Sequence, residues 1–99
     1  MASTFRDVDP AQLRVPSARS TGADPYKLQR QIAKFGASSV GMPPPWVFEC
    51  SDGVLLINNG VTRATRIAKL APGKLIRVEI IGRFRRPHAS DPSIGDLLP

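Results

Sequence analysis

The residues best suited to chemistry are a glycine and an arginine separated by two residues, Gly60-Val61-Thr62-Arg63. They follow the apolar run 54–57 and two asparagines, Asn58 and Asn59, and they precede a helical pattern that extends to residue 70. Asparagine and glycine readily adopt the positive φ of a tight turn. The pattern therefore predicts a strand, a turn and the start of a helix at this point.

A helix start of this kind is suited to binding an anion. Its first backbone N–H groups have no partner within the helix, and the helix dipole places partial positive charge there. Arg63 adds a guanidinium group in the first turn, and such a group binds two phosphate oxygens at once. Asn59 or Thr62 is expected to cap the helix. Many helix starts bind nothing, and the arginine is then only a solvated charge.

The composition predicts one basic globular domain. The chain has 99 residues and a net charge of +6, and ten of its fourteen basic residues are arginine, which favours an anionic partner. No apolar run is long enough to span a membrane, and the N-terminus lacks the apolar core of a signal peptide. The single cysteine, Cys50, is expected to be a small buried side chain. We therefore predict a cytoplasmic protein without a membrane partner.

The hydrophobic periodicity predicts an α+β domain, a sheet of about four strands with two main helices packed on it. The first helix begins at Asp24-Pro25 and ends at Gly36, because these residues are typical of helix starts and stops. Its apolar stripe, Leu28, Ile32 and Phe35, is assigned to the core. Its basic flank is interpreted as a solvated face.

The second helix is predicted over residues 61–70, with Arg63, Arg66 and Lys69 away from its inner face. The strands are expected at residues 13–15, 46–50, 54–57 and 75–81. The first of these lies in an otherwise irregular arm, residues 1–22.

The end of the chain changes in composition after residue 82. Residues 83–88 form a basic tract, and residues 83–99 are expected to be a flexible tail outside a domain of residues 1–82. His88, the only histidine, has no identifiable acid–base partner in the sequence, and we assign it no catalytic role.

The order of these elements resembles the N-terminal domain of the ParB-like/sulfiredoxin-like superfamily over residues 7–82. The resemblance rests on the helix 27–36, the Asp52-Gly53 hairpin and the segment 56–64. The family motif is a strand, a glycine, two variable residues and an arginine that opens a helix, here residues 60–63. Family members include the ATP-dependent reductase sulfiredoxin, CTP-binding segregation proteins and nuclease-like proteins. The resemblance implies a stand-alone ParB-like domain that receives nucleotide phosphates at this corner.

The resemblance also implies site residues by position. Those of the phosphate site are Asn59, which shapes the turn, and Gly60, Thr62 and Arg63. Apart from the resemblance, the basic charge of the chain leads us to expect Arg19, Arg66 and Lys69 as accessory residues that widen the positive field. Sulfiredoxin chemistry requires a cysteine between the glycine and the arginine of the motif. This chain has Val61 and Thr62 there, so a sulfiredoxin-type reductase is not expected.

Three functions remain open on the sequence alone. The first is binding of a nucleotide, with or without Mg²⁺, or of a nucleic acid backbone at residues 60–63. The second is a nuclease or phosphohydrolase at the same place, for which Asp52 or Glu49 would have to hold Mg²⁺. The third is a protein-interaction domain with a decayed site, which would use residues 43–46 or the basic tract. No metal-binding spacing is present in the sequence, and the oligomeric state is open.

Overall fold

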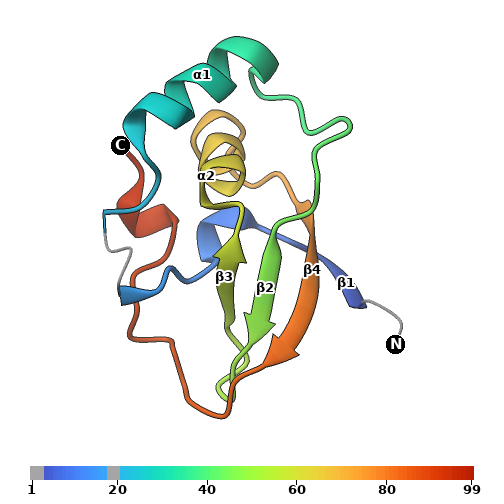
Figure 1. Ribbon diagram of the computed structural model, residues 1–99, viewed down its shortest axis with the longest axis vertical. Helices are drawn as coiled ribbons and strands as arrows, with labels where there is room; N and C mark the ends of the chain where they lie inside the picture. Colours follow the sequence, from blue (N-terminus) through green and yellow to red (C-terminus); the bar gives the residue numbers. More distant parts are fainter. Residues whose placement is uncertain (1–3, 18–20) are drawn as a thin grey trace.

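The computed structural model describes residues 4–17 and 21–99, and it contains a four-stranded mixed sheet and two main helices (Figure 1). The strands are β1 (Thr4–Val8), β2 (Trp46–Glu49), β3 (Leu55–Asn59) and β4 (Ile76–Arg83). The helices are α1 (Pro25–Phe35) and α2 (Val61–Leu70), and single 3₁₀ turns lie at Pro10–Gln12 and Gly95–Leu97. The predicted α+β class with about four strands is confirmed.

The strand order is β1-β4-β2-β3, with β2 and β4 parallel and the other pairs antiparallel. A tight hairpin joins β2 to β3, and α2 then crosses over to β4 on the far side of β2. This topology places the start of α2 at one end of β3 and the hairpin turn at the other end (Figure 1). Gly60 and Asp52 are therefore separated by the length of a strand.

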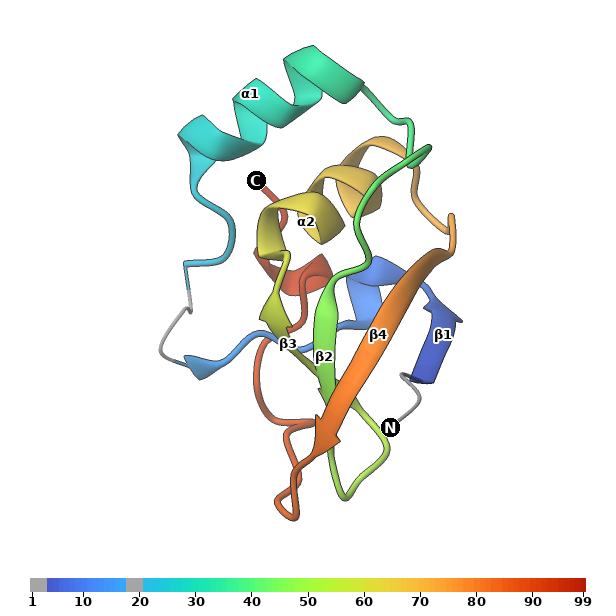
Figure 2. The same cartoon turned by 45° about the vertical axis from the view of Figure 1, so that its right-hand side comes forward.

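Helix α2 covers one face of the sheet, and α1 packs chiefly against α2 (Figure 2). The core between α2 and the sheet includes Ala64, Ile67, Val47, Ile57 and Val78. Since α1 lies on a helix instead of on the sheet, only a narrow line of its surface is covered. Within residues 4–17 and 21–99, no helix is long and apolar enough to cross a membrane.

The predicted core stripe of α1 is only partly correct. Leu28 is buried, whereas Ile32 is half-buried and Phe35 is 47% exposed. A helix that contacts a single neighbouring helix buries one or two positions per turn. The aromatic end of the stripe is therefore left at the surface.

The N-terminal arm contains a strand that was not predicted. Residues 4–8 form β1, which pairs antiparallel with β4. The predicted strand 13–15 is reduced to the single residue Arg14, which forms isolated bridges to Leu56 and Ser93. Its backbone bonds to Leu55 and Ile57 on the edge of β3. Every residue from Thr4 to Asp7 is exposed, so β1 lacks the apolar alternation by which a strand is recognised in sequence.

The segment expected to be a tail outside the domain is packed into it. Ile94 is 1% exposed and belongs to the main core. Its backbone N–H donates to Leu13 O at 2.9 Å, and Val15 N–H donates to Pro92 O at 2.8 Å. The structured domain therefore extends beyond residue 82, because the buried Ile94 and several backbone hydrogen bonds, these two among them, attach the segment.

Candidate functional site

The corner between β3 and α2 has the geometry that the sequence predicts. Gly60 is the N-cap residue of α2 and is left-handed, with φ of 101°. In the described part of the chain, no side chain caps the helix, so the expected cap by Asn59 or Thr62 is wrong. The first N–H groups of α2 therefore have no capping side chain, which is the arrangement in which a helix start can bind an anion.

Arg63 folds back over this corner. Its Nη2 donates to Asn59 Oδ1 at 3.3 Å. A Cβ atom placed on Gly60 would lie 2.8 Å from Arg63 Nη2 and 2.9 Å from Pro45 Cβ. The absence of a side chain at Gly60 therefore makes room for the guanidinium group. Burial lowers the pKa of Arg63, but an arginine remains protonated in proteins.

Two adjoining hollows form a groove between α1 and the start of α2, which we call the α1–α2 groove. The first has a volume of about 220 Å³ and is lined by Gln31 and residues 58–63. The second has a volume of about 290 Å³ and is lined by Lys27, Arg30, Gln31, Lys34, Phe35 and Thr62. They share Gln31 and Thr62. No carboxylate side chain lines either hollow among the residues that the structure describes.

Three cations of α1 line this groove although the sequence analysis assigned them to a solvated face. They are Lys27, Arg30 and Lys34. Their spacing of three and four residues places them along one side of a helix, and this spacing is the feature of the sequence that indicates a shared basic face. This spacing alone does not predict a binding site, because only the fold places α1 beside the start of α2.

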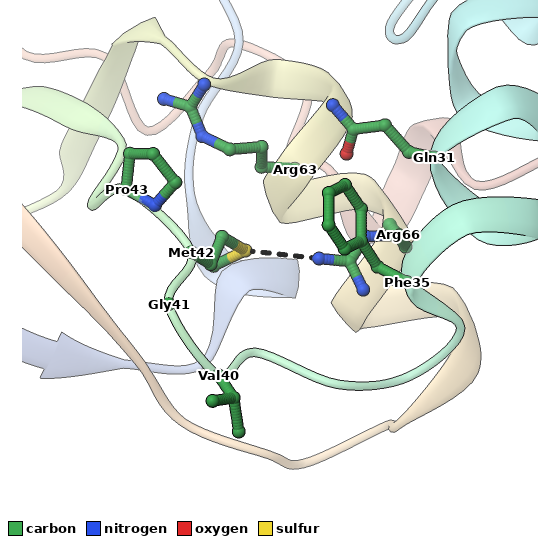
Figure 3. A pocket seen from close by; sticks show the side chains of 8 residues that line it. All are labelled: Gln31, Phe35, Val40, Gly41, Met42, Pro43, Arg63 and Arg66. Carbon is green, nitrogen blue, oxygen red and sulfur yellow. Dashed lines mark hydrogen bonds between the residues drawn. The ribbon is translucent and has the colours of Figure 1, made fainter.

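A smaller cavity of about 70 Å³ lies behind the groove, between α1, α2 and the loop 40–43 (Figure 3). Gln31 and Arg63 line both this cavity and the first hollow. Gln31 Oε1 and Arg63 Nε are buried and have no hydrogen-bond partner within residues 4–17 and 21–99. Buried polar atoms without partners are costly, so a ligand or water that reaches them gains free energy.

Two of the three accessory basic residues, Arg66 and Lys69, do not line the hollow at the corner. Arg66 is 2% exposed beneath α1, where it donates to the carbonyl oxygens of Gly36 and Ser38. Arg66 lies away from the inner face of α2, as predicted, but it does not reach the surface, because α1 and its following loop cover this side of α2. Lys69 lies in the last turn of α2 and donates to Pro99 O at 3.0 Å. Arg19 is outside the described residues.

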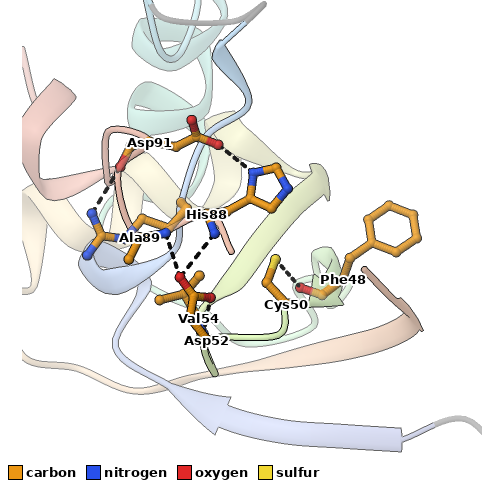
Figure 4. A network of polar contacts seen from close by, with 8 residues as sticks. Phe48, Cys50, Asp52, Val54, His88, Ala89 and Asp91 are labelled. Carbon is orange, nitrogen blue, oxygen red and sulfur yellow. Dashed lines mark hydrogen bonds and ion pairs between the residues drawn. The ribbon is translucent and has the colours of Figure 1, made fainter. Parts of the chain in front are cut away.

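The two carboxylates considered for Mg²⁺ lie at the hairpin end of the sheet. Glu49 is paired with Arg6 at 3.1 Å and with Arg83 at 3.3 Å. Asp52 accepts backbone N–H groups from His88 at 3.0 Å and Ala89 at 2.8 Å (Figure 4). Across residues 4–17 and 21–99, no three His, Cys, Asp or Glu side chains are grouped so that they could hold a metal ion. The expected carboxylates are therefore engaged elsewhere and do not face the corner.

Replacing Asp52 by asparagine is expected to reduce stability at neutral pH but not in acid. Desolvation raises the pKa of Asp52, but N–H groups of Ala89, Val54 and His88 outweigh it and leave the pKa below its usual value. Such a carboxylate adds stability above its unfolded pKa of about 4 and loses it as the pH falls through the folded pKa. Melting temperatures of the two proteins should therefore differ near neutral pH and converge below about pH 4. A constant difference across this range would contradict the assignment.

His88 has a partner that the sequence did not reveal. Its Nδ1 lies 2.7 Å from Asp91 Oδ2, and the ring of Phe84 stacks on Phe48 with centroids 4.3 Å apart. Nearby Cys50 is free and buried, as predicted, and burial is the main cause that raises its pKa. A protonated thiol is a poor nucleophile. These residues hold the C-terminal segment against the hairpin end of the sheet, remote from the groove (Figures 1 and 4).

Comparison with known proteins gives no relative whose binding site could be compared with this one. The resemblance to the ParB-like/sulfiredoxin-like superfamily stays a prediction, carried by the motif at residues 60–63 and the order of the elements. No protein-family model, curated protein or solved structure matches the chain.

Proposed function

We propose that this chain is a small ParB-like domain that binds a phosphate-bearing ligand, a nucleotide or a nucleic acid backbone, at the start of α2. The observation that carries the proposal is the uncapped helix start at Gly60 with the Arg63 guanidinium folded over it, beside a hollow of about 220 Å³. Backbone N–H groups, the helix dipole and a guanidinium group converge there, and each favours an anion.

The charge of the surrounding groove supports the same ligand class. Lys27, Arg30 and Lys34 of α1 line one side, and Arg63 lines the adjoining hollow. No aspartate or glutamate lines these two hollows in the described structure, so the positive potential is not neutralised locally. A concave surface lined by one sign of charge concentrates ligands of the opposite sign.

Binding is better supported than hydrolysis. Cleavage of a phosphate ester requires a general base or metal-binding carboxylates close to the phosphorus. Glu49 and Asp52 are held at the hairpin end of the sheet by ion pairs and backbone hydrogen bonds. The groove itself contributes cations, amides and a hydroxyl group among its described residues, and these bind phosphate without activating water.

Arg63→Ala is expected to weaken binding of the phosphate ligand by at least about tenfold, because it removes a charge-assisted contact. The matched control is Arg85→Ala, which removes the same charge from an exposed position outside the groove. Inorganic phosphate, ATP and CTP, each with and without Mg²⁺, and a short single-stranded oligonucleotide serve as probes. A saturating ligand at about 100 times its Kd should raise the Tm of wild type and control by roughly 10–20 °C.

Titration calorimetry then gives the affinity of each protein for any ligand that shifts the Tm. Equal affinities of Arg63→Ala and wild type would contradict the proposal, as would no binding of any of these probes to folded wild-type protein. Circular dichroism of the free proteins checks that Arg63→Ala remains folded.

A further inference from the structure

We propose that the phosphate-bearing ligand is a single-stranded nucleic acid that lies along the α1–α2 groove. Its phosphates would contact the cations of α1 and Arg63, and its bases would stack on exposed aromatic side chains of α1. This inference rests on the proposed function and deepens it, since it selects one ligand class for the same site.

The length of the cation row favours a strand over a mononucleotide. Lys27, Arg30 and Lys34 span seven residues of helix, about 10 Å at 1.5 Å per residue. Phosphates spaced along a strand match this row of side chains better than a single phosphate group does. Successive phosphates of a nucleic acid strand are separated by about 3.4 Å or more along the strand, so two or three of them lie within that distance. Lys27, Arg30 and Lys34 line the second hollow, and Arg63 continues the row into the first hollow, which shares Gln31 and Thr62 with the second.

Two aromatic side chains of α1 are left uncovered beside these cations. Tyr26 is 69% exposed, and the Arg30 guanidinium carbon lies 5.8 Å from its ring centroid. Phe35 is 47% exposed, lines the groove, and has Lys34 Nζ 5.2 Å from its ring centroid. Proteins that bind single strands combine a positive groove with aromatic rings on which unpaired bases stack. In a duplex the bases are already stacked on one another and cannot reach such rings.

The other basic surface lacks this combination. Arg83 is paired with Glu49, and Phe84 stacks on Phe48 and packs beside His88. The aromatic ring of that segment is therefore already engaged. In the α1–α2 groove, by contrast, the exposed ring of Phe35 lies next to cations, and no carboxylate among the described residues lines the two hollows.

Fluorescence anisotropy with labelled oligothymidine and oligouridine of about 12 nucleotides tests the inference, with a duplex of equal length and unlabelled ATP as competitors. The single strands should bind at least about tenfold more tightly than the duplex or ATP. Four phosphate contacts predict a slope of log K against log salt of about −2.8. The ratio of the oligothymidine and oligouridine affinities shows whether DNA or RNA is preferred.

Two pairs of variants localise the binding. Lys27→Gln/Lys34→Gln should reduce the magnitude of the salt slope by about 1.4, whereas Arg85→Gln/Arg86→Gln should leave it unchanged. Tyr26→Leu should weaken single-strand binding by about tenfold and Tyr26→Phe should preserve it, because only an aromatic ring stacks on a base. The side chain of Tyr26 is exposed, so neither change disturbs the core.

The outcomes separate this inference from the proposed function. If ATP binding requires Arg63 but single strands bind no better than ATP, the single-strand inference is overturned and the proposed function stands. Loss of strand binding that is equal in the groove and control variants also overturns it. If neither phosphates nor strands bind folded protein, both proposals fail.

Discussion

Arg66→Ala is expected to lower the free energy of unfolding by about 3 kcal/mol and the Tm by roughly 12–24 °C. The guanidinium Nη1 of Arg66 donates to Gly36 O at 2.6 Å and to Ser38 O at 2.7 Å, and Nη2 lies 3.4 Å from Met42 Sδ. The group also lies 5.3 Å from the ring centroid of Phe35. Alanine would leave two carbonyl groups without their charged donor and a void beneath α1.

The contacts of Arg66 hold α1 and its following loop on α2, so the variant also tests the groove. Because α1 forms one wall of the groove, Arg66→Ala should weaken ligand binding even at temperatures where it is folded. Lys69→Ala, one turn further along α2 and exposed, is the control and should change stability by less than about 0.5 kcal/mol. Chemical denaturation of both variants measures the difference. A stability of Arg66→Ala within that same margin of wild type would show that the buried guanidinium does not hold the helices together.

Gly60→Ala is expected to destabilise the domain by about 2–3 kcal/mol and to abolish phosphate binding. The first cause is the left-handed backbone of Gly60, which costs a residue with a side chain about 1–3 kcal/mol. The second is space, because the new Cβ would lie 2.9 Å from Pro45 Cβ and 3.1 Å from Pro45 Cα. It would also lie 2.8 Å from Arg63 Nη2, so the guanidinium group must leave the corner.

Gly53→Ala separates these two causes. Gly53 also has a positive φ, 85°, but a Cβ there would meet nothing within 4 Å. We expect it to lose only the cost of backbone strain, about 1 kcal/mol, and to bind the ligand as wild type does. Urea denaturation and calorimetry on both variants provide the comparison. If the two variants lose the same stability and both still bind, then the close contact at Gly60 has no role in placing Arg63.

The helices were predictable because the signals that start and stop them are local. Both α1 and α2 have the bounds that the sequence predicts. In α1, Asp24 Oδ1 accepts the N–H of Tyr26 at 2.8 Å, Pro25 is the first helical residue, and Gly36 ends the helix. Each of these contacts joins residues within one turn. The glycine corner at residue 60 belongs to the same class, so the turn and the helix start there are predictable from the sequence.

The strands were predictable only where they are apolar. β2, β3 and β4 lie within two residues of their expected bounds, since each contains buried aliphatic residues. β1 has none, and it is a strand because β4 offers it an open edge. The same reason explains Ile94, one isoleucine in a polar segment, which is buried because residues 13–15 lie beside it.

The sequence by itself determined the two helices, the three apolar strands and the glycine turn that starts α2 at Gly60, because all of these depend on neighbours within a few residues. The tertiary structure alone decided that α1 lies on α2. That contact buries Arg66 against carbonyl groups 28 and 30 positions away in the chain. It also brings Lys27, Arg30 and Lys34 to the corner and leaves Phe35 uncovered. Such contacts join residues far apart in sequence, and no local pattern of residue types encodes which of them will meet.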